Sequence, residues 1–270
     1  MDWYVDDVYV VSGLVSTVTM MGGVHTISVL ITDDYGNQQT FSFEYEQSVD
    51  PLTLVLLHFT GADGSTTFTN SAPVAYTFIN TNGDAAISST EIKANFGSSG
   101  FFDNSGSIPF RQIESSSTAP DLRNTDFTIE CLIYPTALNF IYCEIFGAQR
   151  GNGDLCYAMA IHQLTNTLGA AIFGSQITHQ TTITLNTVHH IALVRSGDTF
   201  ALYLDGIKST GTQTVTQGTI DNYAPSTTLK IGGGEGGIAA HFTGYIDEFR
   251  LRKEAVYTTD FTPPTTPFTY

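Results

Sequence analysis

Carboxylates and histidines are the side chains of this 270-residue chain that could do chemistry, and their spacing limits that chemistry. Glycoside hydrolysis needs two carboxyl groups about 5–10 Å apart, one to protonate the leaving oxygen and one to attack or to activate water. The predicted strands offer no such pair, because Glu130 and Glu144 each stand alone. Asp247 and Glu248 are adjacent, so on a strand they are expected to point to opposite faces. The sequence therefore argues against a hydrolytic site.

The seven histidines give no metal-binding pattern either. His189 and His190 are consecutive and on a strand cannot chelate one ion, so we expect one to face the core and the other the surface. No GxSxG nucleophile elbow occurs, although a Ser-His-Asp triad built from distant segments stays open. The stretch GGGEGG at 232–237 lacks the Gly-Lys-Ser/Thr end of a phosphate-binding loop. The other histidines are scattered, without HExxH or HxH spacing: His25, His58, His162, His179 and His241.

The elements that must position these groups are strands. In TLNTVHHIALVRSGDTFALYLDGI (184–207), apolar residues alternate on both sides of Ser-Gly-Asp, and Asp-Gly follows. This pattern predicts antiparallel hairpins with one buried face. About a dozen similar short runs follow residue 52, which favours an all-β sandwich or barrel. LTLVLL (52–57) predicts a strand buried on both faces, and 253–257 offers at most a single helical turn.

Residues 1–49 are expected to form a separate unit, joined to the rest by a linker at 47–51. Strand-like runs occupy 2–11, 16–20, 25–34 and 37–46. Four strands are few for a sandwich, so one sheet edge should be open, and open edges are usually covered or paired. We expect a neighbouring chain to complete this unit, with a self-sufficient four-stranded sheet as the alternative.

The composition excludes some partners. The net charge is −16, and eleven Asp and Glu but no Lys or Arg precede Lys93. Such a surface repels phosphate backbones, so no nucleic-acid partner is expected. An acidic surface of this kind suits a basic protein partner or bound divalent cations, and the alternative is that it serves solubility alone. The sequence contains no run of about 18 apolar residues, so it predicts no membrane span. The acidic segment MDWYVDDVYVV is unlike a secretory signal, so either secretion by that route is not expected or a leader lies outside the sequence.

The cysteines point to no metal site. Their number, three, is odd, and no ligand spacing occurs. Cys131 is in phase with Phe127, Ile129 and Ile133, which predicts a small core residue. Folding in a reducing cytosol fits at least as well as a disulfide does.

Seven segments between 52 and 268 resemble the laminin-G-like, concanavalin A-like jelly rolls, and they occur in that family's order. The closing tail YTTDFTPPTTPF is similar to tails common in proteins of tailed phages and of bacteria. HTISVLITDDYGNQQTFSFEY (25–45) resembles the last hairpin of immunoglobulin-like or PKD-type modules. The resemblance implies an all-β fold, a concanavalin A-like jelly-roll sandwich at 52–270 preceded by a partial Ig-like module at 1–49. The segments are LLHFTGADGSTTFTNSA, GFFDNSGS, DFTIECLIYP, NTVHHIALVRSG, FALYLDG, LKIGGGEGG and GYIDEFRL.

The resemblance also implies one structural Ca²⁺. Many relatives hold it with an Asp of the last strand and backbone carbonyls near the first, and Ca²⁺ takes six to eight oxygen ligands. Asp247 matches that position, and Thr60 and Asn104 lie where the backbone donors are expected. Thr60 replaces the Asp of the usual HFDG, which weakens the expectation. The alternative for Asp247 is a buried carboxylate that binds an Arg or backbone N–H groups. Two other departures, Val188 for Trp and Cys131 for an aromatic residue, concern packing.

Sugar binding is the activity that the resemblance implies most directly. It needs polar loop side chains that fix hydroxyl groups and an aromatic face for stacking. The candidate loops are 60–70, 149–154 and 232–237. The expected polar contacts are Arg150, Asn152, Asp154 and Glu235, and Tyr157 is the expected stacking platform.

Together these features predict a non-enzymatic structural or adhesive protein of a tailed-phage virion. Residues 1–49 would dock on other virion proteins of the capsid or tail, and residues 52–270 would contact host-surface carbohydrate. We expect a homo-oligomer on the particle surface, assembled in the host cytoplasm. The alternatives are a polysaccharide-degrading enzyme on the same fold and a bacterial cell-surface adhesin.

Overall fold

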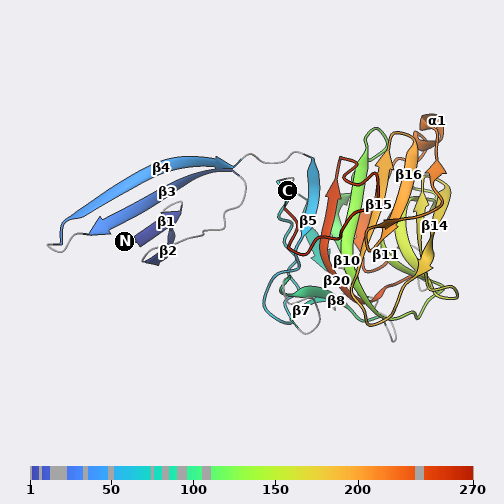
Figure 1. The fold of residues 1–270 in the computed structure, drawn as a ribbon, viewed down its shortest axis with the longest axis horizontal. Helices are drawn as coiled ribbons and strands as arrows, with labels where there is room; N and C mark the ends of the chain where they lie inside the picture. Colours follow the sequence, from blue (N-terminus) through green and yellow to red (C-terminus); the bar gives the residue numbers. More distant parts are fainter. Residues whose placement is uncertain are drawn as a thin grey trace. The chain divides into compact units, whose positions relative to one another are not determined.

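A computed structural model of the chain describes residues 2–5, 8–12, 23–32, 36–47, 52–73, 76–80, 85–89, 96–104, 111–234 and 240–269. The chain divides into two compact units, residues 1–51 and 52–270 (Figure 1). The described residues contain no helix with the length and hydrophobicity that a membrane crossing requires.

Unit 1 contains a four-stranded antiparallel sheet with the order β2-β1-β3-β4. β3 and β4 pair without a register shift, from Gly23 opposite Gln47 to Thr32 opposite Gln38. The run 2–11, expected as one strand, is instead a hairpin of two short strands, and the run 16–20 lies outside the described residues. Among the described residues, β4 has a neighbour on one side only. The bounds are β1 Asp2–Val5, β2 Val8–Ser12, β3 Gly23–Thr32 and β4 Gln38–Gln47.

Unit 2 is a sandwich of two antiparallel sheets, which confirms the predicted fold class (Figure 1). The nine-stranded sheet has the order β17-β16-β15-β10-β20-β8-β7, and β18 and β5 pair with β16 and β20. Its strands are β5 Thr53–Leu57, β7 Ala86–Ser88, β8 Ser99–Phe102, β10 Phe127–Ala137, β15 His189–Ser196, β16 Thr199–Leu204, β17 Ile207–Lys208, β18 Gln213–Thr214 and β20 Thr243–Arg252.

The seven-stranded sheet has the order β14-β13-β12-β11-β19-β9-β6. One short helix, α1 (Gln217–Ile220), is present, and residues 253–257 form no helical turn. The strands of this sheet are β6 Phe78–Asn80, β9 Ile113–Thr118, β11 Tyr142–Gln149, β12 Leu155–His162, β13 Thr167–Ile172, β14 Ser175–Thr182 and β19 Thr228–Ile231.

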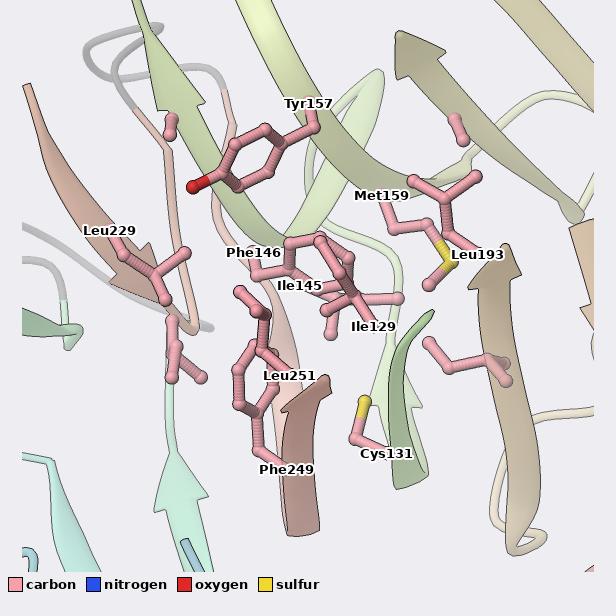
Figure 2. Close-up of a cluster of buried hydrophobic side chains, with 14 of the residues drawn as sticks. Ile129, Cys131, Ile145, Phe146, Tyr157, Met159, Leu193, Leu229, Phe249 and Leu251 are labelled. Atoms are coloured by element: carbon pink, nitrogen blue, oxygen red, sulfur yellow. The ribbon is translucent and has the colours of Figure 1, made fainter. Parts of the chain in front are cut away.

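The core lies between the two sheets. Figure 2 shows side chains of both sheets converging, among them Ile129 and Leu193 from one and Ile145 and Met159 from the other. Full burial of an aliphatic or aromatic side chain stabilises a fold by about 1.5–3 kcal/mol. Every residue of β5 is buried, as LTLVLL predicts. Cys131 lies in this core, and all three cysteines are free and buried.

The turns around β16 follow the predicted hairpin chemistry. β15 and β16 pair from Ile191–Leu204 to Ser196–Thr199, around the turn that contains Gly197. After β16, Asp205 and Gly206 both have positive φ, 52° and 79°, as a type I′ hairpin turn requires. A methyl group at Gly206 would collide with the carbonyl of Phe261, so this glycine also lets a distant segment approach.

That segment, residues 254–269, is called the strap here and covers the outer face of the nine-stranded sheet. Its Tyr257 and Phe261 rings stack at 3.6 Å and pack on Tyr203. The Tyr257 hydroxyl donates to Glu130 Oε2 (2.8 Å), and the Phe268 N–H donates to Glu248 Oε2 (2.6 Å). The strap is therefore bonded to the strands beneath it.

The strap explains why one histidine prediction is wrong. His189 pairs in register with core-facing Ile133, and His190 pairs with Leu132 on the other face. The second face was expected to be the surface, yet His190 is only 2% exposed. The rings of Phe261 and Phe268 pack against its imidazole, and its Nε2 lies 3.0 Å from Glu130 Oε2.

Candidate functional site

A groove of about 650 Å³ lies over strands β11 to β14 of the seven-stranded sheet. Its volume falls within the roughly 300–1,000 Å³ of typical ligand sites. The core side chains of β12 and β13 point inward, so the alternate residues of these strands form the groove floor. The described lining is Tyr142, Glu144, Gln149, Gly153, Leu155, Ala158, Ala160, His162, Thr165, Thr167, Gly169, Ala170, Ala171, Gln176, Ile177, Thr178 and Ala240.

Strand register arranges this lining in rows across the sheet. Glu144, Ala160, Gly169 and Thr178 are direct neighbours on β11 to β14. In the next row, the lining residues Ala158, Ala171 and Gln176 lie side by side, and Gly147 of β11 continues the row outside the described lining. β12 and β13 thus carry only small residues in both rows, while Glu144 of β11 and the Gln176 and Thr178 side chains of β14 stand on the flanking strands. The groove exists because Ala and Gly occupy the two strands between β11 and β14.

Glu144 stands at the edge of this floor and is 6% exposed. Its carboxylate lies beside two glycines, Gly147 of the same strand and Gly234 beyond β19. A methyl group at either glycine would collide with the Glu144 carboxylate. Both glycines are therefore needed to seat this side chain at the groove.

An aromatic pair stands at one end of the groove. The Tyr142 and His162 rings meet edge to face with centroids 5.2 Å apart. Tyr142 is 53% exposed, so one side of its ring is available to a ligand. Ile141 and Leu164 on the adjacent turns are also exposed, and the Gln163 N–H donates to the Ile141 carbonyl and holds the turns together. This end offers apolar surface beside polar floor residues.

The groove lining combines a single carboxyl group with neutral hydrogen-bonding groups. In its described lining, Glu144 is the one carboxylate, whereas glycosidases of the usual kind need two. Hydroxyl and amide groups of Thr165, Thr167, Thr178 and Gln176 provide hydrogen-bond donors and acceptors along the walls.

One of the three loops predicted to bind sugar, residues 149–154, lies at the other end, where Gln149 and Gly153 line the groove. The structure brings Arg150, Asn152 and Asp154 together, but they bond to one another. Both Arg150 and Asn152 donate to Asp154 Oδ2, and these hydrogen bonds lower the Asp154 pKa. The Arg150 guanidinium also stacks 4.6 Å from the centre of the Tyr223 ring. These groups stabilise the loop and are largely occupied.

The stacking role expected for Tyr157 is wrong. Its side chain is fully buried, and its hydroxyl donates to the Pro120 carbonyl at 2.9 Å. Figure 2 shows the ring among core residues. Tyr157 alternates with the groove residues of β12 and therefore faces the opposite side of the sheet. Glu235, the remaining predicted contact, lies outside the described residues.

Of the residues expected to hold Ca²⁺, Asn104 lies apart from Asp247. The Asn104 side chain donates to the Phe242 carbonyl (2.6 Å) and accepts from the Arg111 N–H (2.7 Å), so it fastens loops together. Asp247 lies five residues beyond Phe242, roughly 16 Å along an extended chain. One ion cannot bind both residues, because Ca²⁺–oxygen distances are about 2.4 Å. Thr60 follows Phe59, and continuation of the β5–β20 pairing past Leu57 and Phe249 brings this part of the chain beside Asp247, so a calcium site that does not use Asn104 stays a prediction.

Asp247 itself is buried, and among the described residues neither carboxyl oxygen has a hydrogen bond of normal geometry, although the Glu248 backbone N–H lies near enough to lower its pKa somewhat. Burial and the nearby Glu248 carboxylate raise its pKa to about 9, so it is uncharged at neutral pH. Within the described residues, no group of three or more His, Cys, Asp and Glu side chains could hold a metal ion. The structure thus favours a buried Asp247 beside the Glu248 backbone N–H, and the described residues give it no Arg partner.

The strand pairing of β20 at Asp247 and Glu248 also differs from the simple alternation that the sequence argument assumed. Leu132 lies opposite Asp247, and Glu130 lies opposite Arg250, so β20 has one extra residue in a β-bulge. Glu248 sits at this bulge with φ of 51°. Strict alternation fails there, so adjacency alone could not assign these two carboxylates to opposite faces.

Sequence reasoning missed the groove itself. The one available signal was small residues at alternate positions of neighbouring strands: Ala158 and Ala160 in CYAMAIH, and Gly169 and Ala171 in TLGAAIF. The outward positions of an exposed strand are usually polar, so Ala and Gly there mark an unusual face. Only the fold shows that β12 and β13 lie side by side.

Comparisons with known proteins agree with this fold. Among curated proteins none matches. A binding domain of botulinum neurotoxin DC, in complex with rat synaptotagmin II, is 12% identical over 78% of this chain and 50% of that one, with a TM-score of 0.53. Botulinum neurotoxin type C, whose cell entry depends on two ganglioside molecules, is 11% identical over 76% of this chain and 49% of its own, with a TM-score of 0.54.

A sialidase of Trypanosoma rangeli in complex with sialic acid is 12% identical over 87% of this chain and 41% of its own, with a TM-score of 0.54. The chain thus spans half or less of these structures, and at such identities the likeness extends to the fold. A family model, the concanavalin A-like lectin/glucanases superfamily, matches residues 111–260. That is more than half of the chain and includes every strand of the groove, so the chain belongs to the concanavalin A-like lectin/glucanase superfamily.

Proposed function

We propose that this protein binds an extended glycan in the groove over β11 to β14, without cleaving it. The observation that carries the proposal is the groove itself, a shallow floor of Ala and Gly with an exposed Tyr142 at one end. Sugar rings present apolar C–H faces and a rim of hydroxyl groups. A flat small-residue floor suits the faces, and the Thr and Gln side chains suit the hydroxyls.

The single carboxylate of the described lining supports binding without hydrolysis. Glu144 could serve as an acid or a nucleophile, but a partner at about 5–10 Å is required for turnover. A reducing-end assay on any glycan that binds tests this point. Release of reducing ends that disappears in Glu144→Gln would make the protein a glycanase and contradict the non-enzymatic proposal.

The binding proposal is tested by filling the groove. Ala171 lies on the floor between Ala158 and Gln176, and Ala171→Trp would occupy the trough. We expect binding on a glycan array by the natural chain, and its loss in Ala171→Trp with an unchanged melting temperature. Thr259→Trp adds the same ring at an exposed position of the strap, outside the groove, and should bind normally. Equal binding by all three proteins would exclude the groove.

We further propose that the protein is a homo-oligomeric component of a tailed-phage particle. Unit 1 would dock on capsid or tail proteins, and unit 2 would contact host-surface carbohydrate. The phage-like tail sequence and the one-sided pairing of β4 support this context. Light scattering tests the oligomeric state, and antibody labelling of purified particles tests the location. A monomer absent from particles would contradict the proposal.

A further inference from the structure

The groove carries an unusual charge pattern for a site on a glycan-binding fold. Among the described residues that line it, Glu144 is acidic and no lysine or arginine occurs. Acidic sugars carry carboxylates or sulfates, which proteins usually recognise with Arg or Lys. An anion placed in this groove would lose hydration without gaining a cationic partner, and that loss is costly.

The cations near the groove are already paired. Lys230 lies opposite Gly147 on β19, with its Nζ 3.7 Å from Glu114 Oε1. At the far end, Arg150 is bound to Asp154 and to the Asn222 carbonyl. Recruiting either cation would break an existing ion pair, so neither offers a ready site for a ligand carboxylate.

The net negative charge of the whole chain also disfavours anionic ligands. The chain carries 26 acidic and 10 basic residues, a net charge of −16. Charges of one sign repel ligands of that sign at long range and slow their association. Glu144, which is nearly buried at the floor, is a carboxyl group and so offers an anionic ligand no positive charge in exchange for its lost hydration.

Resting on the proposed function, we infer that the groove selects uncharged glycans and discriminates against sialylated, uronic and sulfated ones. The ligand class is a chain of neutral or N-acetylated sugars that lies along β12 and β13. This sets the groove apart from sites for sialic acid and gangliosides, which are acidic ligands.

The test uses an array of neutral glucan, mannan, galactan and N-acetylglucosamine oligosaccharides. Each is printed beside its carboxymethyl ether and beside the amide of that ether, which has nearly the same size without the charge. We expect the parent and the amide to bind alike and the carboxymethyl form to bind at least tenfold more weakly. Equal or tighter binding of carboxymethylated or sialylated glycans would overturn the inference and leave the proposed function standing. No binding to any glycan would overturn both.

Two variants locate the discrimination in the groove. Thr178→Lys places a cation on the wall beside Gly169 and should raise the affinity for the carboxymethyl form roughly fivefold, the size of one exposed ion pair. Glu144→Gln should also reduce the difference in affinity between neutral and acidic ligands. Thr259→Lys adds the same charge at an exposed position of the strap, outside the groove, and should leave the ratio unchanged. An equal effect of Thr259→Lys and Thr178→Lys would assign the selectivity to net charge and contradict the inference.

Discussion

The outer faces of the two sheets in unit 2 differ completely. The face of the nine-stranded sheet is covered by the strap, and beneath it charged groups are buried, including Glu130 and Arg250. The face of the seven-stranded sheet is open and floored by alanine and glycine. One face contributes to stability, and the other carries the groove in which we propose that a glycan binds. On that proposal the sandwich separates folding from binding, and substitutions on the two faces should affect different measurements.

The largest expected effect is on the covered face. Arg250 donates from Nε and Nη2 to Glu130 Oε1 at 2.9 and 2.6 Å. Burial alone would raise the Glu130 pKa, but His190 and Arg250 outweigh it and lower that pKa. Arg250→Met leaves this carboxylate buried with one partner fewer, so we expect the free energy of unfolding to fall by about 3–5 kcal/mol. Urea denaturation measures the loss.

A double variant sharpens that experiment. Glu130→Gln together with Arg250→Met removes both charges, so part of the lost stability should return. A loss below about 1 kcal/mol for Arg250→Met alone would mean that the strap tolerates an unpaired carboxylate, and the contrast between the two faces would weaken.

Asp247 gives the next effect, with a defined pH dependence. Its folded-state pKa of about 9 exceeds the unfolded value near 3.9, so the folded protein retains a proton that the unfolded chain releases. This group therefore lowers stability progressively from about pH 4 to pH 9. Asp247→Asn removes the penalty. We expect a melting temperature at least about 3 °C higher at pH 7.5 and no difference near pH 4.

The same variant separates this view from a calcium site. If Asp247 bound Ca²⁺, Asp247→Asn would lower the melting temperature at pH 7.5, and a chelator would lower that of the natural chain. We expect neither, since Asn104 lies too far from Asp247 to share an ion with it. A stabilisation of the natural chain by millimolar Ca²⁺ would refute the account of a protonated Asp247.

The smallest effect on stability belongs to the open face. Tyr142→Ala removes an exposed ring, so the unfolding free energy should change by less than about 0.5 kcal/mol. Glycan affinity should fall about fivefold or more, because truncating an aromatic anchor of an interface usually costs over 1 kcal/mol. Calorimetric titration measures the affinity. Leu164→Ala, on an exposed neighbour outside the described lining, is the matched control, and a similar loss there would assign binding to the turns instead.

The sequence predicted the fold because period-two alternation survives in the long strands. β10, β15, β16 and β20 all lie where apolar residues alternate between turn residues. The pattern failed where a strand is short or polar. β17 and β18 have two residues each, and β9 reads IESSST with only Ile113 and Ser115 buried. Those strands form because neighbouring strands offer hydrogen bonds, which a local pattern does not encode.

The site was less predictable because it depends on register between distant strands. Tyr157 and Ala158 are adjacent in sequence, yet one is in the core and the other in the groove, and only the pairing with β11 and β13 assigns the faces. His190 looked like a surface residue because nothing in its own strand reports that residues 254–269 return to cover it. The bulge at Glu248 likewise depends on pairing with β10.

The three cysteines have a practical consequence for optical measurements. Burial raises the Cys131 pKa well above its ordinary value and that of Cys156 to about 11, and it also raises the Cys143 pKa. Thiolate is the form that reacts with maleimides, so the native thiols should stay unlabelled. A single cysteine introduced at an exposed position such as Thr178 would then carry the fluorophore alone, with no native residue removed.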